Sequence, residues 1–149
     1  MGKVKREPNP AQVYLEQIEK LNSIIPNKLV ERQQWLDLAL SITAHMDGER
    51  VSSSGTRSKL EEAMNSCMDA AAEIAAAVEK LRREKQERIE TIELLDSPTE
   101  YRLLHDRYVK YIELKTIAEQ WGKDYSTITT THGRALSHVQ AILDSRKQK

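Results

Sequence analysis

The chain has 149 residues, enough for one domain, or for a small domain with a helical extension. Its formal net charge is zero, which excludes a uniformly basic surface for nucleic acid. The charge is uneven, however: residues 1–96 carry 14 Lys and Arg against 17 Asp and Glu, whereas residues 97–149 carry 9 against 6. The C-terminal third is therefore positive and the remainder negative.

Residues that favour helices dominate the chain. Residues that break helices are few, with five glycines and four prolines, and phenylalanine is absent. We therefore expect an all-α fold. The single cysteine, Cys67, can form no internal disulfide, which favours a reducing cytoplasm. No apolar run is long enough for a signal peptide or a membrane span, so we expect a soluble protein without a membrane partner. No paired acids, metal ligands, activated nucleophile or phosphate loop stands at productive spacing. We therefore expect neither an enzyme nor a cofactor.

The N-terminal region begins with residues 1–10, which are polar, contain two prolines and predict a flexible tail. Apolar residues at helical spacing from Val13 to Ile25 predict a first helix that Pro26 ends. A second apolar stripe then predicts another helix that fades at Gly48; its members are Leu29, Trp35, Leu36, Ala39, Leu40 and Ile42. The Ser- and Gly-rich segment that follows, about residues 47–56, predicts a linker.

Residues 57–96 contain no proline or glycine and predict one unusually long helix. Its apolar residues alternate at spacings of four and three, as in a coiled coil: Leu60, Met64, Cys67, Ala71, Ile74, Val78 and Leu81. A helix of this length needs a partner along it. That partner is either the preceding helix folded back or the same helix of another subunit, and both arrangements are compatible with the pattern. We therefore interpret residues 11–96 as a helical, coiled-coil oligomerisation region.

Ser97 and Pro98 mark the start of a last region, residues 97–149. Ser97 can cap a helix, Pro98 suits its first position, and Glu100 completes a capping box. The helix predicted over residues 98–112 places on one face Tyr101, Leu104, Tyr108 and Ile112. This helix would support the motif that follows it.

Residues Leu114–Gly133 have the pattern of a helix-turn-helix. Ala118 is small where the two helices cross, and Gly122 suits the left-handed end of the first helix. Ser126 is expected to cap the second helix, and Ile128 to point into the core. A three-helix unit of this kind places its last helix in a DNA major groove, whereas an ordinary helical corner is the alternative.

The last helix exposes small hydroxyl residues opposite its apolar stripe. The side chains expected to face the groove are Ser126, Thr127, Thr129, Thr130 and Arg134, and those placed to contact phosphates are Lys115, Thr116, Lys123 and Tyr125. Gly133 leaves room for close approach, and His132 falls near the buried side. The predicted ligand is double-stranded DNA.

The C-terminal run resembles the promoter-reading C-terminal region of bacterial sigma factors. Within that group, it is most similar to phage late transcription regulators of the ArpU and RinA type. The resemblance rests on Arg107-Tyr108, Ile117-Ala118, Tyr125-Ser126 and the run from His132 to Leu136, and it extends to residues 41–55 before the long helix. The chain departs from the pattern at Trp121 and Asp124, where Leu and Asn are more usual.

The resemblance implies a phage or prophage activator of late packaging and morphogenesis genes that works with bacterial RNA polymerase in the host cytoplasm. It also implies the same groove-facing residues. A homo-oligomer is expected, with a dimer favoured. Two alternatives remain open: a DNA-recognition subunit of a phage packaging complex, similar to a small terminase, and a coiled-coil protein that binds no DNA.

Overall fold

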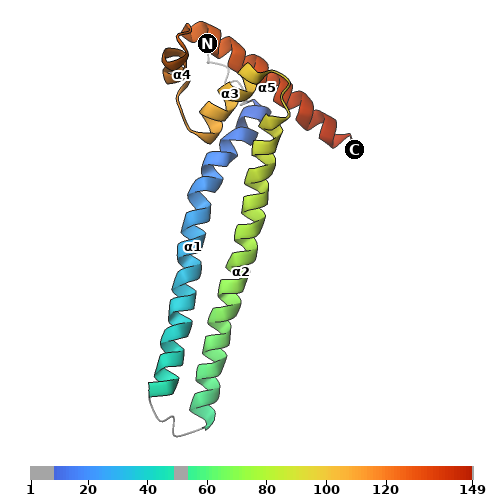
Figure 1. Ribbon diagram of the computed structural model, residues 1–149. Helices are drawn as coiled ribbons and strands as arrows, with labels where there is room; N and C mark the ends of the chain where they lie inside the picture. The colour runs from blue at the N-terminus through green and yellow to red at the C-terminus, as the bar shows by residue number, and fades with distance from the viewer. Residues whose placement is uncertain (1–8, 49–53, 149) are drawn as a thin grey trace, which may run out of the picture. The chain divides into compact units, whose positions relative to one another are not determined.

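The computed structural model describes residues 9–48 and 54–148, and these residues form helices and turns without a strand (Figure 1). The helices are α1 (Pro10–Gly48), α2 (Ser54–Glu93), α3 (Pro98–Leu104), the π-helix η1 (His105–Val109), α4 (Leu114–Trp121) and α5 (Tyr125–Lys147). The predicted all-α class is confirmed. Most of the predicted tail and the centre of the predicted linker lie outside the described residues. Helix α1 starts at Pro10, inside the predicted tail, and α2 starts at Ser54, inside the predicted linker.

The chain divides into two compact units whose boundaries differ from the predicted division at residue 97. Unit 1 contains Met1–Asn22 and Glu84–Lys149, and unit 2 contains Ser23–Arg83. The N-terminal part of α1 and the C-terminal part of α2 therefore belong to the same unit as α3, α4 and α5. This division matters for the candidate site because its supporting core draws on both ends of the chain.

Helix α1 continues through Pro26, so the predicted helix end at this proline is wrong. Proline has no N–H, and its presence leaves the carbonyl of Asn22 without its helical donor. Leu21 and Ile25 are buried in the turns before the proline, and the next buried residue of α1 after it is Ala39. The missing hydrogen bond coincides with the boundary between the two units, which falls after Asn22.

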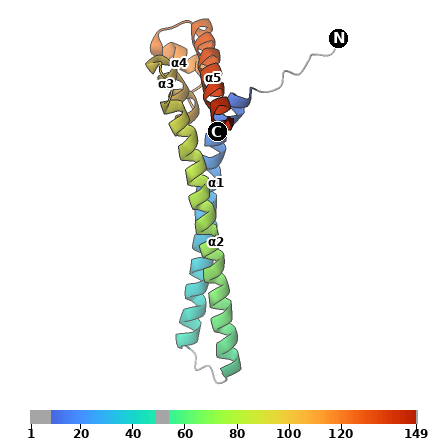
Figure 2. The same cartoon turned by 90° about the vertical axis from the view of Figure 1, so that its right-hand side faces the viewer.

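Unit 2 is an antiparallel helical hairpin in which the later part of α1 runs beside α2 (Figure 2). Thr43 Oγ1 lies 3.1 Å from Met64 Sδ, which fixes the pairing near the closed end. The predicted seam of α2 is confirmed, because Cys67, Ala71 and Val78 are buried. On α1 only part of the predicted stripe is covered: Ala39 is buried, whereas Trp35 and Leu40 are exposed.

Unit 1 has a main hydrophobic core to which five helical segments contribute. Its buried members come from α1, the end of α2 and the chain after it, α3, η1 and α5: Ala11, Leu15, Ile18, Ile92, Leu95, Leu104, Tyr108, Ala135, Leu136 and Val139. Thr91 is also fully buried, and Arg146 donates a 2.8 Å hydrogen bond to its hydroxyl. The guanidinium of Arg88 stacks 4.6 Å from the ring centre of Tyr14. The first turns of α1 are therefore built into the C-terminal unit.

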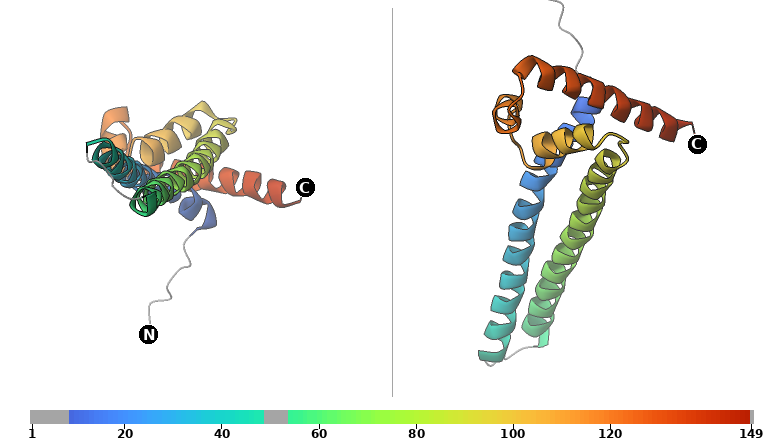
Figure 3. Two further views of the ribbon diagram at one scale, coloured as in Figure 1. Left: turned by 90° about the horizontal axis from the view of Figure 1, so that it is seen from below. Right: turned by 45° about the horizontal axis from the view of Figure 1, so that its top comes forward.

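A second, smaller core joins α3 to α4 and α5. Its buried residues are Leu103, Ile117, Ala118 and Ile128, with Ile112, Leu114 and Trp121 packed around them. Ala118 and Ile128 thus occupy the core positions expected for them. Figure 3 shows α5 crossing over α3 within this unit, and α4 lies against both neighbours through this core.

The support helix starts as predicted but ends differently. Ser97 Oγ accepts a 3.3 Å hydrogen bond from the backbone N–H of Glu100, and Pro98 is the first helical residue. After Leu104 the chain widens into η1, and the N–H of Lys110 donates to the carbonyl of His105. Of the predicted face, Leu104 and Tyr108 are buried as expected, whereas Tyr101 is exposed; Leu103, outside that face, is fully buried.

The turn between α4 and α5 is set by Gly122, which has φ +64°, the left-handed conformation expected there. The N–H of Lys123 then donates to the carbonyl of Ala118 at 3.0 Å. The predicted cap at Ser126 is wrong: Asp124 is the N-cap residue, and its carbonyl accepts from the N–H of Ile128. Because the cap comes two residues earlier, Ser126 lies in the first turn of α5.

Replacing Gly122 by Ala is expected to destabilise unit 1 by about 1–2 kcal/mol, since alanine is strained at positive φ. Gly133 provides the matched control because it lies within α5, where an added Cβ meets no atom within 4 Å. Gly133→Ala should stabilise the unit by about 0.5–1 kcal/mol through helix propensity. Urea denaturation followed by circular dichroism measures both changes. A change of the same sign in the two variants would contradict the expectation.

Candidate nucleic-acid interface

The exposed face of α5 forms a shallow hollow with a volume of about 250 Å³. It is lined by Ser126, Thr127, Thr130, Thr131 and Arg134. Four of these residues belong to the predicted groove-facing set; Thr131 was missed because simple angle counting places it at the edge of the face. The hollow combines small hydroxyl side chains with one guanidinium, a composition that can meet the edges of base pairs.

The remaining predicted residues do not line this hollow. Thr129 is half-buried and does not line the hollow. Lys115 and Thr116 lie in the first turn of α4, whereas Lys123 precedes α5 and the largely exposed Tyr125 begins it. Positions at the start of these two helices suit contacts with the sugar-phosphate backbone on either side of a groove.

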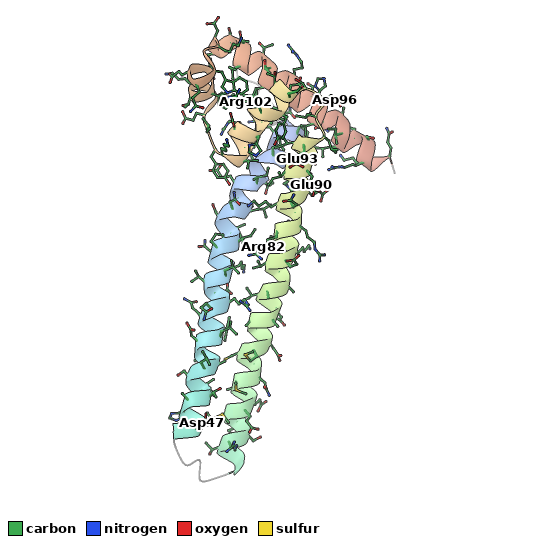
Figure 4. The ribbon with its side chains drawn as sticks, viewed as in Figure 1. Asp47, Arg82, Glu90, Glu93, Asp96 and Arg102 are labelled. Carbon is green, nitrogen blue, oxygen red and sulfur yellow. The ribbon has the colours of Figure 1, made fainter. Side chains whose placement is uncertain are left out.

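A second hollow lies beside the turn between α4 and α5. It is lined by Arg102, a positively charged residue that the sequence did not single out. It has a volume of about 510 Å³ and is lined by Pro98, Thr99, Arg102, Gln120, Trp121 and Lys123. The guanidinium of Arg102, labelled on α3 in Figure 4, lies 4.6 Å from the ring centre of Trp121. Arg102 and Lys123 therefore present two positive charges from separate elements. The positive charge of the C-terminal third was a signal for such residues, but only the packing of α3 against α4 identifies Arg102.

A hydrogen-bonded aromatic pair connects α5, the helix that carries the hollow, to η1. The hydroxyl of Tyr108 lies 2.8 Å from Nε2 of His132, and the two rings stack at 5.8 Å. Burial raises the pKa of Tyr108 to about 12. Burial, together with the nearby Arg107, lowers the pKa of His132 below 6.5. At neutral pH the neutral imidazole can accept a hydrogen bond from the Tyr108 hydroxyl, and this bond connects α5 to η1.

Acidification is expected to weaken this connection. The folded pKa of His132 is lower than its unfolded value of 6.5, so the unfolded state binds more protons once the pH falls below 6.5. The free energy of unfolding should therefore decrease as the pH falls from 6.5 towards the pKa of His132 in the folded state. Urea denaturation between about pH 7.5 and 5 should show this decline, and His132→Gln should flatten it. Equal slopes in both proteins would show that other groups cause the decline.

Glu100 and His138 of this unit are engaged in a structural contact. The carboxylate of Glu100 is buried and lies 2.7 Å from Nδ1 of His138. Within the described residues, no group of three or more His, Cys, Asp or Glu side chains is placed to hold a metal ion. Nor is any helix in those ranges both long and apolar enough for a membrane span.

Comparison with known proteins adds no relative: no protein-family model, curated protein or solved structure matches the chain.

Proposed function

We propose that this chain is a sequence-specific DNA-binding transcription regulator whose α4 and α5 act as a helix-turn-helix. The observation that carries the proposal is the exposed face of α5, with its hydroxyl side chains and Arg134, held over a core that α3 and α4 complete. In this mode α5 enters the major groove. Its first turns contact base edges, while Lys115, Thr116, Lys123 and Tyr125 contact phosphates.

The charge distribution supports this proposal. The acidic excess lies in residues 1–96 and the basic excess in residues 97–149, which include both hollows. A local excess of this sign favours the approach of a polyanion without making the whole protein adhere to DNA. The acidic Asp124 departs from this pattern, but its position is the N-cap of α5, where a negative charge favours the helix.

By its resemblance to the ArpU and RinA type, the regulator would activate late packaging and morphogenesis genes of a phage or prophage. It would act in the bacterial cytoplasm together with RNA polymerase. Genome-wide recovery of DNA fragments bound by the protein in its host tests this assignment. Enrichment of a motif upstream of late genes is expected. Recovery of fragments without a shared motif would contradict sequence-specific regulation.

Arg134 is the residue of the α5 hollow that can recognise a guanine with two hydrogen bonds. Arg134→Ala should weaken binding to the recovered site by about 1–3 kcal/mol if these bonds form. A gel-shift affinity equal to that of the wild type would show that another surface reads the DNA.

Arg102 is expected to bind a backbone phosphate together with Lys123. Arg102→Ala should weaken binding to DNA of any sequence and reduce the slope of log affinity against log salt by about 1. Arg102→Lys keeps the charge and should keep the slope. Arg57, an exposed residue of unit 2 paired with Glu61, provides a control whose replacement by Ala should change neither quantity. Fluorescence anisotropy over a salt series measures all four proteins.

The proposed assembly is a homodimer formed by unit 2. A two-helix hairpin is a single layer, whereas a stable hydrophobic core needs a second layer to cover it. Unit 2 leaves large apolar residues exposed on α1 and α2, namely Val30, Trp35, Leu38, Leu40 and Met68. A second copy of the hairpin supplies a covering layer of the same composition, and the product is a four-helix bundle with twofold symmetry.

A further inference from the structure

Four hydroxyl groups of α5 donate hydrogen bonds to the backbone of the helix itself. Thr130 Oγ1 donates a 2.8 Å hydrogen bond to the carbonyl of Ser126, and Thr131 Oγ1 donates a 2.9 Å bond to the carbonyl of Thr127. Thr129 and Ser137 make the same kind of bond, at 3.0 Å and 3.1 Å. A hydroxyl has one proton to donate. While these bonds persist, none of these four side chains can donate a hydrogen bond to a base.

Each threonine of this set still offers two features to a ligand. Its oxygen keeps lone pairs that can accept a hydrogen bond, and its methyl group occupies the other branch of Cβ. Thr130 is exposed and Thr131 half-buried, and both line the hollow on α5. Thr130 and Thr131 therefore contribute methyl groups and acceptors to the hollow, next to the strong donor Arg134.

Base pairs differ in what they offer to such a surface. In the major groove guanine presents two acceptors, which need a donor, whereas thymine presents a methyl group beside one acceptor. The amino groups of adenine and cytosine can donate to a threonine oxygen. Contact between methyl groups removes apolar surface from water and requires no proton from threonine.

We infer that Thr130 and Thr131 recognise thymine through its 5-methyl group, so that the DNA facing the first turns of α5 contains A·T pairs at these positions. Guanine recognition falls to Arg134, the one residue of the hollow with a guanidinium. This inference rests on the proposed DNA-binding function and specifies the class of sequence that the same site reads.

The test combines paired changes in protein and DNA. The DNA probe is the fragment selected most strongly by the wild-type protein from a random duplex library. Each thymine in it is replaced in turn by deoxyuridine, which removes the methyl group and leaves the pairing intact. Thr130→Ser removes the methyl group and keeps the hydroxyl, whereas Thr130→Val keeps a methyl group and removes the hydroxyl. Thermal melting followed by circular dichroism verifies the folding of both variants.

Loss of one methyl contact should weaken binding about three- to fivefold. This loss is expected for deoxyuridine at one or more thymines facing α5 and for Thr130→Ser, while Thr130→Val should bind within about twofold of the wild type. Thr130→Ser with the deoxyuridine probe should lose no more than either change alone, because both remove the same contact.

Two results would overturn the inference, and they have different meanings. If the wild type selects a sequence but deoxyuridine has no effect and Thr130→Val loses binding while Thr130→Ser keeps it, the hydroxyl reads the base and methyl recognition is wrong. If the wild type binds no duplex above background at low salt, the proposed DNA-binding function fails, and the inference fails with it.

Discussion

Replacing Leu15 by Ala is expected to lower the free energy of unfolding of unit 1 by about 2–5 kcal/mol. Leu15 lies on α1 near the N-terminus, more than 80 residues before the core residues of α3 and α5. Its side chain has no exposed surface and belongs to the same buried cluster as Leu104 and Val139. Truncation removes the transfer free energy of the lost methyl groups and leaves a cavity that the helices around it fill only in part.

The matched control is Leu94→Ala, which makes the same chemical change in the same unit. Leu94 is 58% exposed, so its truncation should change stability by about 0.5 kcal/mol or less. Urea denaturation followed by circular dichroism compares the two variants. Similar losses for Leu15→Ala and Leu94→Ala would show that the N-terminal helix does not stabilise the core.

A shorter chain should be destabilised for the same reason. A fragment of residues 97–149 retains α3, α4 and α5 but lacks five buried members of the main core, Ala11, Leu15, Ile18, Ile92 and Leu95. The fragment should fold poorly and bind DNA weakly. The full chain, which also contains residues 10–22 and 84–96, should fold stably and bind DNA more tightly. Cooperative unfolding of the isolated fragment with the stability of the full chain would contradict this view.

Local sequence signals predicted several features of the fold because the relevant interactions are local. Gly122 marks a left-handed helix end, and Ser97 followed by Pro98 marks a helix start; both depend on a few adjacent residues. The seam of α2 followed from the spacing of Cys67, Ala71 and Val78 along one helix. Such features need no knowledge of the tertiary structure.

Other features depended on contacts that no local pattern contains. Proline usually ends a helix, but α1 continues through Pro26, with Leu21 and Ile25 buried in the turns before it. Ser126 and Asp124 are both good capping residues, and the short path after Gly122 selects Asp124. The π-helix η1 after Leu104, which ends the predicted support helix early, has no signal in the apolar spacing.

The candidate site shows the same division. Four of the five predicted groove-facing residues line the hollow on α5, because the periodicity of one helix determines its exposed face. Arg102 was missed because its relevance comes from stacking on Trp121, a residue of another helix. The contribution of Leu15 to the core beneath the site was missed for a similar reason: it lies at the other end of the chain.

Introducing negative charge on the exposed side of unit 2 should convert the proposed dimer into monomers. Trp35, Leu38 and Ile42 follow one another at helical spacings of three and four, so they share one side of α1. Trp35 and Leu38 are 37% and 47% exposed. In the proposed four-helix bundle this side is covered by the second copy, and the double variant Trp35→Glu/Leu38→Glu would bury two unpaired charges per subunit.

The DNA affinity of an assembly depends on how many copies of α5 it presents. A dimer presents two copies of α5, and binding of the second copy to a linked half-site strengthens overall binding by about 10²–10⁴. The double variant should lose this gain while keeping the weaker binding of a single copy. Gln33→Glu, an exposed substitution on the opposite side of the same helix, should leave both the dimer and DNA affinity unchanged.

Light scattering coupled to gel filtration measures the assembly directly. The wild type is expected at twice the 17.1 kDa mass of the chain and the double variant at that mass, with helical content verified by circular dichroism. A monomeric wild type, or a dimer that survives both substitutions, would exclude this face as the interface. A ring of eight or more subunits would instead favour a packaging subunit, because such a ring presents many copies of α5 to one DNA, whereas a regulator of a twofold site needs two.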